Sequence, residues 1–127
     1  MAEREKIESL ARRILNAMAA YKEGASPPAG IDDAIGLYDA EGDTVPLWVT
    51  TTGVVRDSDG PILRFDSIAE VHAPKSKSRA DPDSSRIALV MEDGTRETIV
   101  VAGGRGRFCD SFEFSRFLSR AARLSHP

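Results

Sequence analysis

The sequence predicts an α+β fold with an N-terminal amphipathic helix, a strongly bent antiparallel sheet or roll of about six to seven strands, and a C-terminal capping helix. Apolar residues recur at three- and four-residue spacing near both ends of the chain, which indicates helices with one buried face. The middle of the chain alternates β-branched and polar residues between Asp-Gly turns. A length of 127 residues, with 41% hydrophobic and 29% charged residues, is typical of one globular domain.

The N-terminal helix is predicted over residues 3 to 23, and it ends where Gly24 can adopt a left-handed backbone. Its apolar face consists of Ile7, Leu10, Ile14, Met18 and Tyr21. This face either packs on the domain's own sheet or pairs with a second copy as a short coiled coil. Residues 1–24 are therefore expected to be an interaction or dimerisation arm.

Residues 25–44 are predicted to be a linker with a possible first strand, and residues 45–127 to be the sheet with its helix. In the sheet, "LWVTTTGVV" is expected to be a strand with a turn near Gly53, and "RDSDGP" the hairpin turn leading into "ILRF". "DSIAEVHA" continues as a short strand. "RIALVMEDGTRETIVVAG" is predicted to be a second hairpin with Asp93-Gly94 at its tip.

The C-terminal helix is predicted to run from Asp110 to Leu124, with Asp110 as its N-cap and Glu113 completing a capping box. His126 is expected in a frayed tail. The buried stripe of this helix consists of Phe114, Phe117, Leu118 and Ala121.

The succession "LWVTTTGVV", "ILRFDSIAEV", "IALVMEDGTRETIVV" and "DSFEFSRFL", over about residues 45 to 122, resembles the small bacterial pleckstrin-homology-like (PH-like) domains. The resemblance implies that the bent sheet forms a roll plugged by the C-terminal helix. The loop expected to carry basic lipid-binding residues is the acidic "AEGD" here, and Phe117 stands where a tryptophan is often found. No phosphoinositide binding is expected.

A glycine-rich stretch, "GGRGRF", precedes the C-terminal helix and contains Gly104, Arg105, Gly106 and Arg107. It lacks the third glycine of a dinucleotide fingerprint and the Lys-Ser/Thr pair of a P-loop. Backbone N–H groups before a helix, with two arginines close by, could hold an anion or a partner's carboxylate. The alternative is a connector whose glycines only turn the chain, and we expect this connector.

The loop at residues 74–85, expected to be a mobile surface segment, carries one basic run, Lys75, Lys77 and Arg79. This run either steers an acidic partner or stays solvated. The single cysteine, Cys109, suggests a second hypothesis, in which a pocket near Cys109, His72 and Arg105 serves a small-molecule or anion binder or a small enzyme. A lone cysteine is, however, typical of a buried packing residue.

The composition argues against several classes of function. A net charge of −3 leaves no basic field for nucleic acid, and no apolar run reaches the length of a signal core or a membrane span. Neither a histidine cluster nor a set of cysteines offers a metal shell, so no cofactor or metal is expected. We expect a cytoplasmic, non-enzymatic module that binds another protein, either through an exposed strand edge or as a homodimer through the N-terminal helix.

Overall fold

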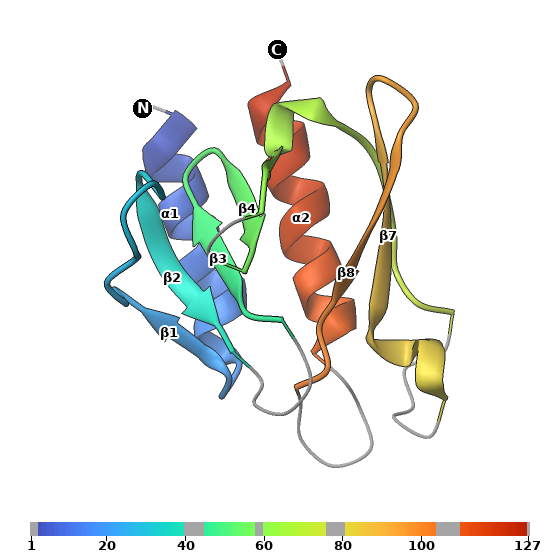
Figure 1. Ribbon diagram of the computed structural model, residues 1–127, viewed down its shortest axis with the longest axis horizontal. Coiled ribbons are helices and arrows are strands. Elements are labelled where there is room, and N and C mark those ends of the chain that lie inside the picture. Colours follow the sequence, from blue (N-terminus) through green and yellow to red (C-terminus); the bar gives the residue numbers. More distant parts are fainter. Residues whose placement is uncertain (1–2, 40–44, 58–59, 76–80, 104–109, 127) are drawn as a thin grey trace.

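The computed structural model describes residues 3–39, 45–57, 60–75, 81–103 and 110–126. Within these residues the chain forms two α-helices and eight strands, and each strand pair is antiparallel (Figure 1). The elements are α1 (Glu3–Ile14), β1 (Tyr21–Glu23), β2 (Ala34–Tyr38), β3 (Leu47–Thr50), β4 (Gly53–Arg56), β5 (Ile62–Arg64), β6 (Ile68–His72), β7 (Arg86–Met91), β8 (Arg96–Val100) and α2 (Ser111–Ser125).

The N-terminal helix is shorter than its apolar spacing predicted. It ends at Ile14 and continues as one 3-10 turn, η1 (Leu15–Ala17). The amide of Tyr21 then bonds the carbonyl of Met18 at 3.1 Å, which turns the chain into β1. Tyr21 therefore lies on a strand and not on the helix, because pairing of β1 with β2 outweighs the helix preference of this segment.

The first sheet contains five strands in the order β1-β2-β3-β4-β5. Residues 25–44, which were predicted to be a linker with a possible first strand, contribute β2, and β1 precedes it in the chain. The turn between β3 and β4 is organised by the Thr50 hydroxyl, which accepts the amides of Thr52 and Gly53 at 3.1 and 3.0 Å and donates to the Gly53 carbonyl at 2.9 Å. A side-chain hydrogen-bond network of this kind fixes a short turn.

The second sheet contains three strands in the order β6-β7-β8. Its β7–β8 hairpin confirms the prediction made from Asp93 and Gly94. Gly94 has a positive φ of 89°, and the Asp93 carboxylate accepts both the amide and the hydroxyl of Thr95, at 2.9 and 2.6 Å. These two bonds hold the pKa of Asp93 below its ordinary value.

The single bent sheet expected from the sequence is instead two sheets. Strand pairing stops between β5 and β6, where the 3-10 turn η2 (Phe65–Ser67) buries Phe65 completely. Arg56 at the end of β4 bonds across to the second sheet, at 2.9 Å to the Thr98 carbonyl and 2.7 Å to the Glu97 carboxylate. Side chains, not a continuous ladder, thus connect the two sheets.

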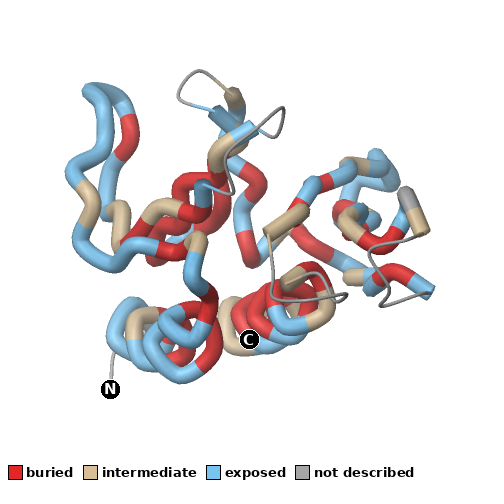
Figure 2. Tube along the Cα trace, turned by 90° about the horizontal axis from the view of Figure 1, so that it is seen from below, coloured by how far each residue is buried: buried red, intermediate tan, exposed pale blue. Residues whose placement is uncertain are grey.

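The two helices lie side by side against the sheets, and α1, α2 and both sheets contribute to one hydrophobic core (Figure 2). Four aromatic rings run through this core in edge-to-face contact. Tyr38 of β2 meets Phe114 at 5.6 Å, Phe114 meets Phe117 at 6.0 Å, and Phe117 meets Phe65 at 5.8 Å. Residues of α2 therefore join the first sheet to the turn between the sheets.

The capping box predicted for α2 is not formed. Asp110 adopts a helical backbone and makes no side-chain cap bond, and its carboxylate accepts a 2.9 Å hydrogen bond from the Tyr38 hydroxyl. Glu113 instead pairs with Arg116, one turn along the helix, at 2.5 Å. A tertiary hydrogen bond has replaced the local one, which ties the start of α2 to β2.

Part of the segment expected to be a mobile loop is packed. Residues Pro82–Ser85 form a 3-10 turn, η3, which begins where the Asp81 carboxylate accepts the Asp83 amide at 2.9 Å. Ser84 is buried, and its carbonyl accepts a hydrogen bond from the Ser111 hydroxyl. This end of the loop is thereby attached to the start of α2.

Candidate functional site

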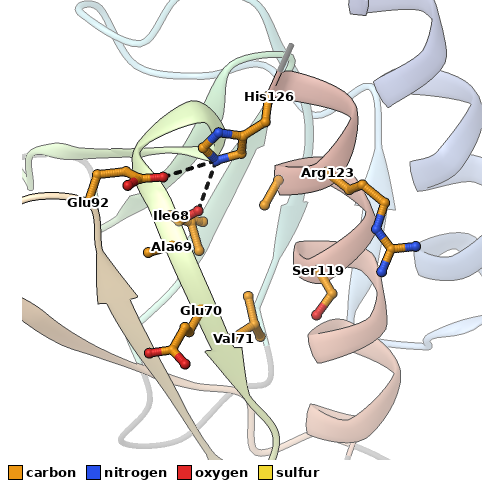
Figure 3. Close-up of a pocket in the computed structure, with 9 residues that line it drawn as sticks. Ile68, Ala69, Glu70, Val71, Glu92, Ser119, Arg123 and His126 are labelled. Atoms are coloured by element: carbon orange, nitrogen blue, oxygen red, sulfur yellow. Dashed lines mark hydrogen bonds and ion pairs between the residues drawn. The ribbon is translucent and has the colours of Figure 1, made fainter.

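A groove of about 520 Å³ separates β6 from the C-terminal half of α2 (Figure 3). Side chains of Val71 and Ser119 extend into the gap from the strand and the helix, whereas Glu70 lies on the other side of the strand. The size falls within the usual range for ligand sites. The groove is lined by Ile68, Ala69, Glu70, Val71, Glu92, Ser119, Ala122, Arg123 and His126.

One wall of this groove is the outer edge of β6. In antiparallel pairs, alternate residues turn both backbone groups toward the neighbouring strand. The Val101 amide bonds the Ser85 carbonyl at 2.7 Å and the Met91 amide bonds the Thr95 carbonyl at 2.8 Å. The backbone N–H and C=O groups of the odd-numbered residues of β7 therefore point toward β8, and those of the even-numbered residues point toward β6.

This alternation determines which β6 groups are free. Glu70 and His72 are paired with the even-numbered residues of β7, so they take part in the ladder. Val71 lies between them and directs its N–H and C=O away from β7, at the outer edge of β6. Within the described residues, Val71 makes no other backbone hydrogen bond. The outer edge of β6, beside the groove, therefore carries a backbone donor and acceptor that no other described backbone group bonds.

His126 closes one end of the groove. Its Nε2 lies 3.0 Å from the Ile68 carbonyl and 3.6 Å from the Glu92 carboxylate. The Ile68 carbonyl thus points away from β7, toward the C-terminal end of α2. The bulge between Ile68 and Glu70 shifts the register of β6, so Ile68 and Val71 both direct their backbone groups away from β7. Beyond this end, Arg64 donates two hydrogen bonds to Asp66, at 3.0 and 2.9 Å, and lowers the pKa of that carboxyl.

The α2 side of the groove carries two small side chains and one arginine. Ala122 is buried and Ser119 is half-buried. Because both side chains are short, they leave the α2 backbone near the surface of the groove. Arg123 is exposed, and within the described residues it forms no ion pair. The helix thus contributes two small side chains to the groove, and the Arg123 guanidinium lies on the side of α2 away from β6 (Figure 3).

Two further cavities have different surroundings. One of about 400 Å³ lies on the outer face of the first sheet, near Trp48 and Val55, where the loop residue Ile31 covers part of the sheet. The other, of about 410 Å³, lies where α1 meets β1. The ion pair of Arg12 with Glu23, at 2.8 Å, borders it and lowers the pKa of the Glu23 carboxyl.

The apolar residues of the predicted interaction helix lie in the hydrophobic core of the protein. Its five predicted contact residues are all buried in the core shared with α2 and the sheets, so the first alternative, packing on the chain itself, describes their position. Their exposures are Ile7 0%, Leu10 1%, Ile14 7%, Met18 5% and Tyr21 7%.

Most of the predicted loop sites lie outside the described residues. These are Gly104, Arg105, Gly106, Arg107 and Cys109 before α2, and Lys77 and Arg79 of the basic run. Lys75 is exposed. His72 is exposed at the end of β6, with its Nε2 3.9 Å from the Glu70 carboxylate.

Sequence reasoning missed the groove because its walls are separated by more than forty residues of chain. His126, expected in a frayed tail, is half-buried and bonded to Ile68, which corrects that prediction. The one available signal was the pattern of β6, where Ile68 and Val71 are apolar and Glu70 and His72 are polar. That pattern indicates a half-buried strand but not which of its edges is free.

Comparisons with protein-family models, with curated proteins and with solved structures find no match. In the part of the chain that the structure describes, no helix is both long and apolar enough to cross a lipid bilayer. The same residues contain no group of three or more His, Cys, Asp or Glu side chains arranged to hold a metal ion. The groove must therefore be interpreted from its own geometry.

Proposed function

We propose that this chain is a PH-like protein-interaction module that binds an extended segment of a partner protein as an additional strand on β6. The plan of the chain supports the PH-like assignment, because two meandering antiparallel sheets are followed by a helix whose aromatic face lies in their common core. The sequence resemblance implies one bent sheet plugged by the C-terminal helix, and the position of that helix in the core agrees with this plan.

A single observation carries the binding proposal. Beside the groove, the outer edge of β6 carries the N–H and C=O of Val71, which bond no other backbone group among the described residues. The opposite wall of the groove is a helix with small side chains. Strand addition uses such edges, because main-chain hydrogen bonds supply affinity and alternate side chains enter pockets. The five residues of β6 extend over roughly 17 Å, enough for a short peptide strand.

The position of the edge is expected to disfavour pairing of β6 with the same strand of another copy. Exposed edges are commonly protected by a covering element or by charges. Here α2 flanks the edge, and Glu70 and His72 place polar groups on the outer surface of the strand. A flexible single segment can enter the groove more easily than the edge of a folded sheet.

Proline substitution at Val71 tests this function. Its ring removes the outward N–H and obstructs a new strand, but no β6–β7 ladder bond is lost, because that N–H does not face β7. Val100→Pro is the matched control, since Val100 lies on the outer edge of β8 and is also turned away from β7. Folding of both variants is verified by thermal unfolding.

The binding assay uses short random peptides selected against the full chain from a display library. We expect the selected peptides to bind wild type and Val100→Pro alike, and to bind Val71→Pro at least roughly tenfold more weakly, the equivalent of losing one or two hydrogen bonds. Equal binding to a folded Val71→Pro variant, or a selection that enriches no peptide, would refute the proposed function.

A further inference from the structure

Two charged residues of the groove lining lack a strong partner in the part of the chain that the structure describes. Arg123 on the rim of α2 is exposed and, within the described residues, has no ion pair. Glu70 on the outer surface of β6 has a 61% exposed side chain and only His72 nearby, at 3.9 Å. The two charges have opposite signs: Glu70 extends to the side of β6 away from α2, and Arg123 starts from the helix wall of the groove with its guanidinium on the far side of α2 (Figure 3).

An added strand would bring its side chains to these charges in a fixed order. Each pair in the described sheets is antiparallel, so we consider an antiparallel segment and call the residue opposite Val71 the central residue. Directly opposite residues point to the same face of a sheet. The central residue therefore faces α2 at Ser119, and the next residue lies opposite Glu70 on the outer face.

The residue after that one returns to the helix side, nearer to His126. Two residues of an antiparallel strand advance about 6.8 Å. Ser119 and Arg123 are four residues apart on α2, which corresponds to about 6 Å along the helix axis. Because α2 runs from the level of Val71 toward the Ile68 carbonyl, this residue arrives at the level of Arg123 along the helix, within reach of its long side chain once that side chain turns toward the groove.

Resting on the proposed function, we propose that the partner segment carries the order apolar, basic, acidic from its N- to its C-terminal end. The apolar side chain is small and lies against Val71, Ser119 and Ala122. The basic side chain pairs with Glu70 across the strands, and the acidic side chain pairs with Arg123. The groove thereby fixes both the direction and the register of its ligand.

Charge reversal tests this order. The display selection is repeated on the full-length variants Arg123→Glu and Glu70→Lys. Arg120→Glu, an exposed change on α2 outside the groove lining, and Glu5→Lys, an exposed change on α1, are the matched controls. Peptides selected on wild type are then titrated against each variant.

On wild type, selection is expected to enrich the apolar-basic-acidic order. Arg123→Glu should weaken these peptides roughly fivefold, as expected for losing one exposed ion pair, and should change the preferred acidic residue to a basic one. Glu70→Lys should change the preferred basic residue to an acidic one. Neither control should alter the motif.

The two proposals fail in different ways. Peptides that depend on Val71 but show no charge preference, show the reversed order, or respond equally to the control variants would overturn the motif and leave strand addition intact. Peptides that bind a folded Val71→Pro variant unchanged, or a selection without enriched peptides, would remove the binding site itself.

Discussion

The substitution Leu10→Ala tests whether α1 belongs to the core of the chain. Leu10 is 1% exposed and packs in the cluster shared by α1, α2 and both sheets. Truncating a fully buried leucine typically costs about 3 kcal/mol, from lost transfer energy and the cavity left behind. This is a large fraction of the roughly 5–15 kcal/mol that stabilises most domains. In a chain of this length the melting temperature should fall by roughly 10–15 °C.

Urea unfolding at several protein concentrations, together with light scattering, measures both the stability and the mass. Arg13→Ala is the control, because Arg13 is exposed on the same helix and its loss should change stability by less than about 0.5 kcal/mol. A loss below about 1 kcal/mol for Leu10→Ala would contradict the packing described for α1. If light scattering showed a lower mass for Leu10→Ala than for wild type, this would instead support the alternative hypothesis that the chain dimerises through this helix.

Three further predictions concern the first sheet. Gly36→Ala should destabilise the chain by about 1–3 kcal/mol, because a Cβ would meet the Tyr21 ring, and a double-mutant cycle with Tyr21→Ala should recover most of this loss; additive losses would refute the contact. Burial raises the pKa of Tyr21 to about 12, so stability present below about pH 10 should decline as the pH rises toward 12, in unfolding measured across the alkaline range. The Tyr21→Phe variant should lack this decline, and an identical slope would exclude Tyr21 as its source. Tyr38→Phe should cost about 1.5–3 kcal/mol by removing the hydrogen bond to Asp110, and a cycle with Asp110→Ala that shows no coupling would contradict it.

Local signals in the sequence were sufficient where local chemistry decides the structure. The β7–β8 hairpin was predicted correctly because Asp93 and Gly94 satisfy its turn by themselves. The position of α2 followed from its apolar stripe, which is buried as expected. In these elements, short-range hydrogen bonds and hydrophobic periodicity favour the same structure.

Predictions were wrong where a distant contact outweighed the local preference. Tyr21 fits a helical spacing, but its side chain covers Gly36 from a strand. Asp110 is suited to capping α2, but its carboxylate accepts a bond from Tyr38, 72 positions away. At the break between the two sheets, Phe65 likewise contacts a residue far away in the sequence, Phe117 of α2.

The groove could not be predicted from the sequence for the same physical reason. Its binding edge depends on which neighbour β6 pairs with, and its second wall comes from the end of the chain. Val71 has no sequence feature that distinguishes it from other strand valines. Only the pairing of β6 with β7 on one side, with α2 across the groove on the other, makes its backbone groups available.

Hydrogen exchange at the Val71 amide, followed residue by residue by NMR, tests the central claim most directly. In the free chain, the Val71 amide should exchange faster than those of Glu70 and His72, which are bonded in the ladder. Saturation with a selected peptide should slow exchange at Val71 and leave the other two largely unchanged. Equal protection of the three amides in the free chain, or no protection of Val71 in the complex, would contradict strand addition at β6.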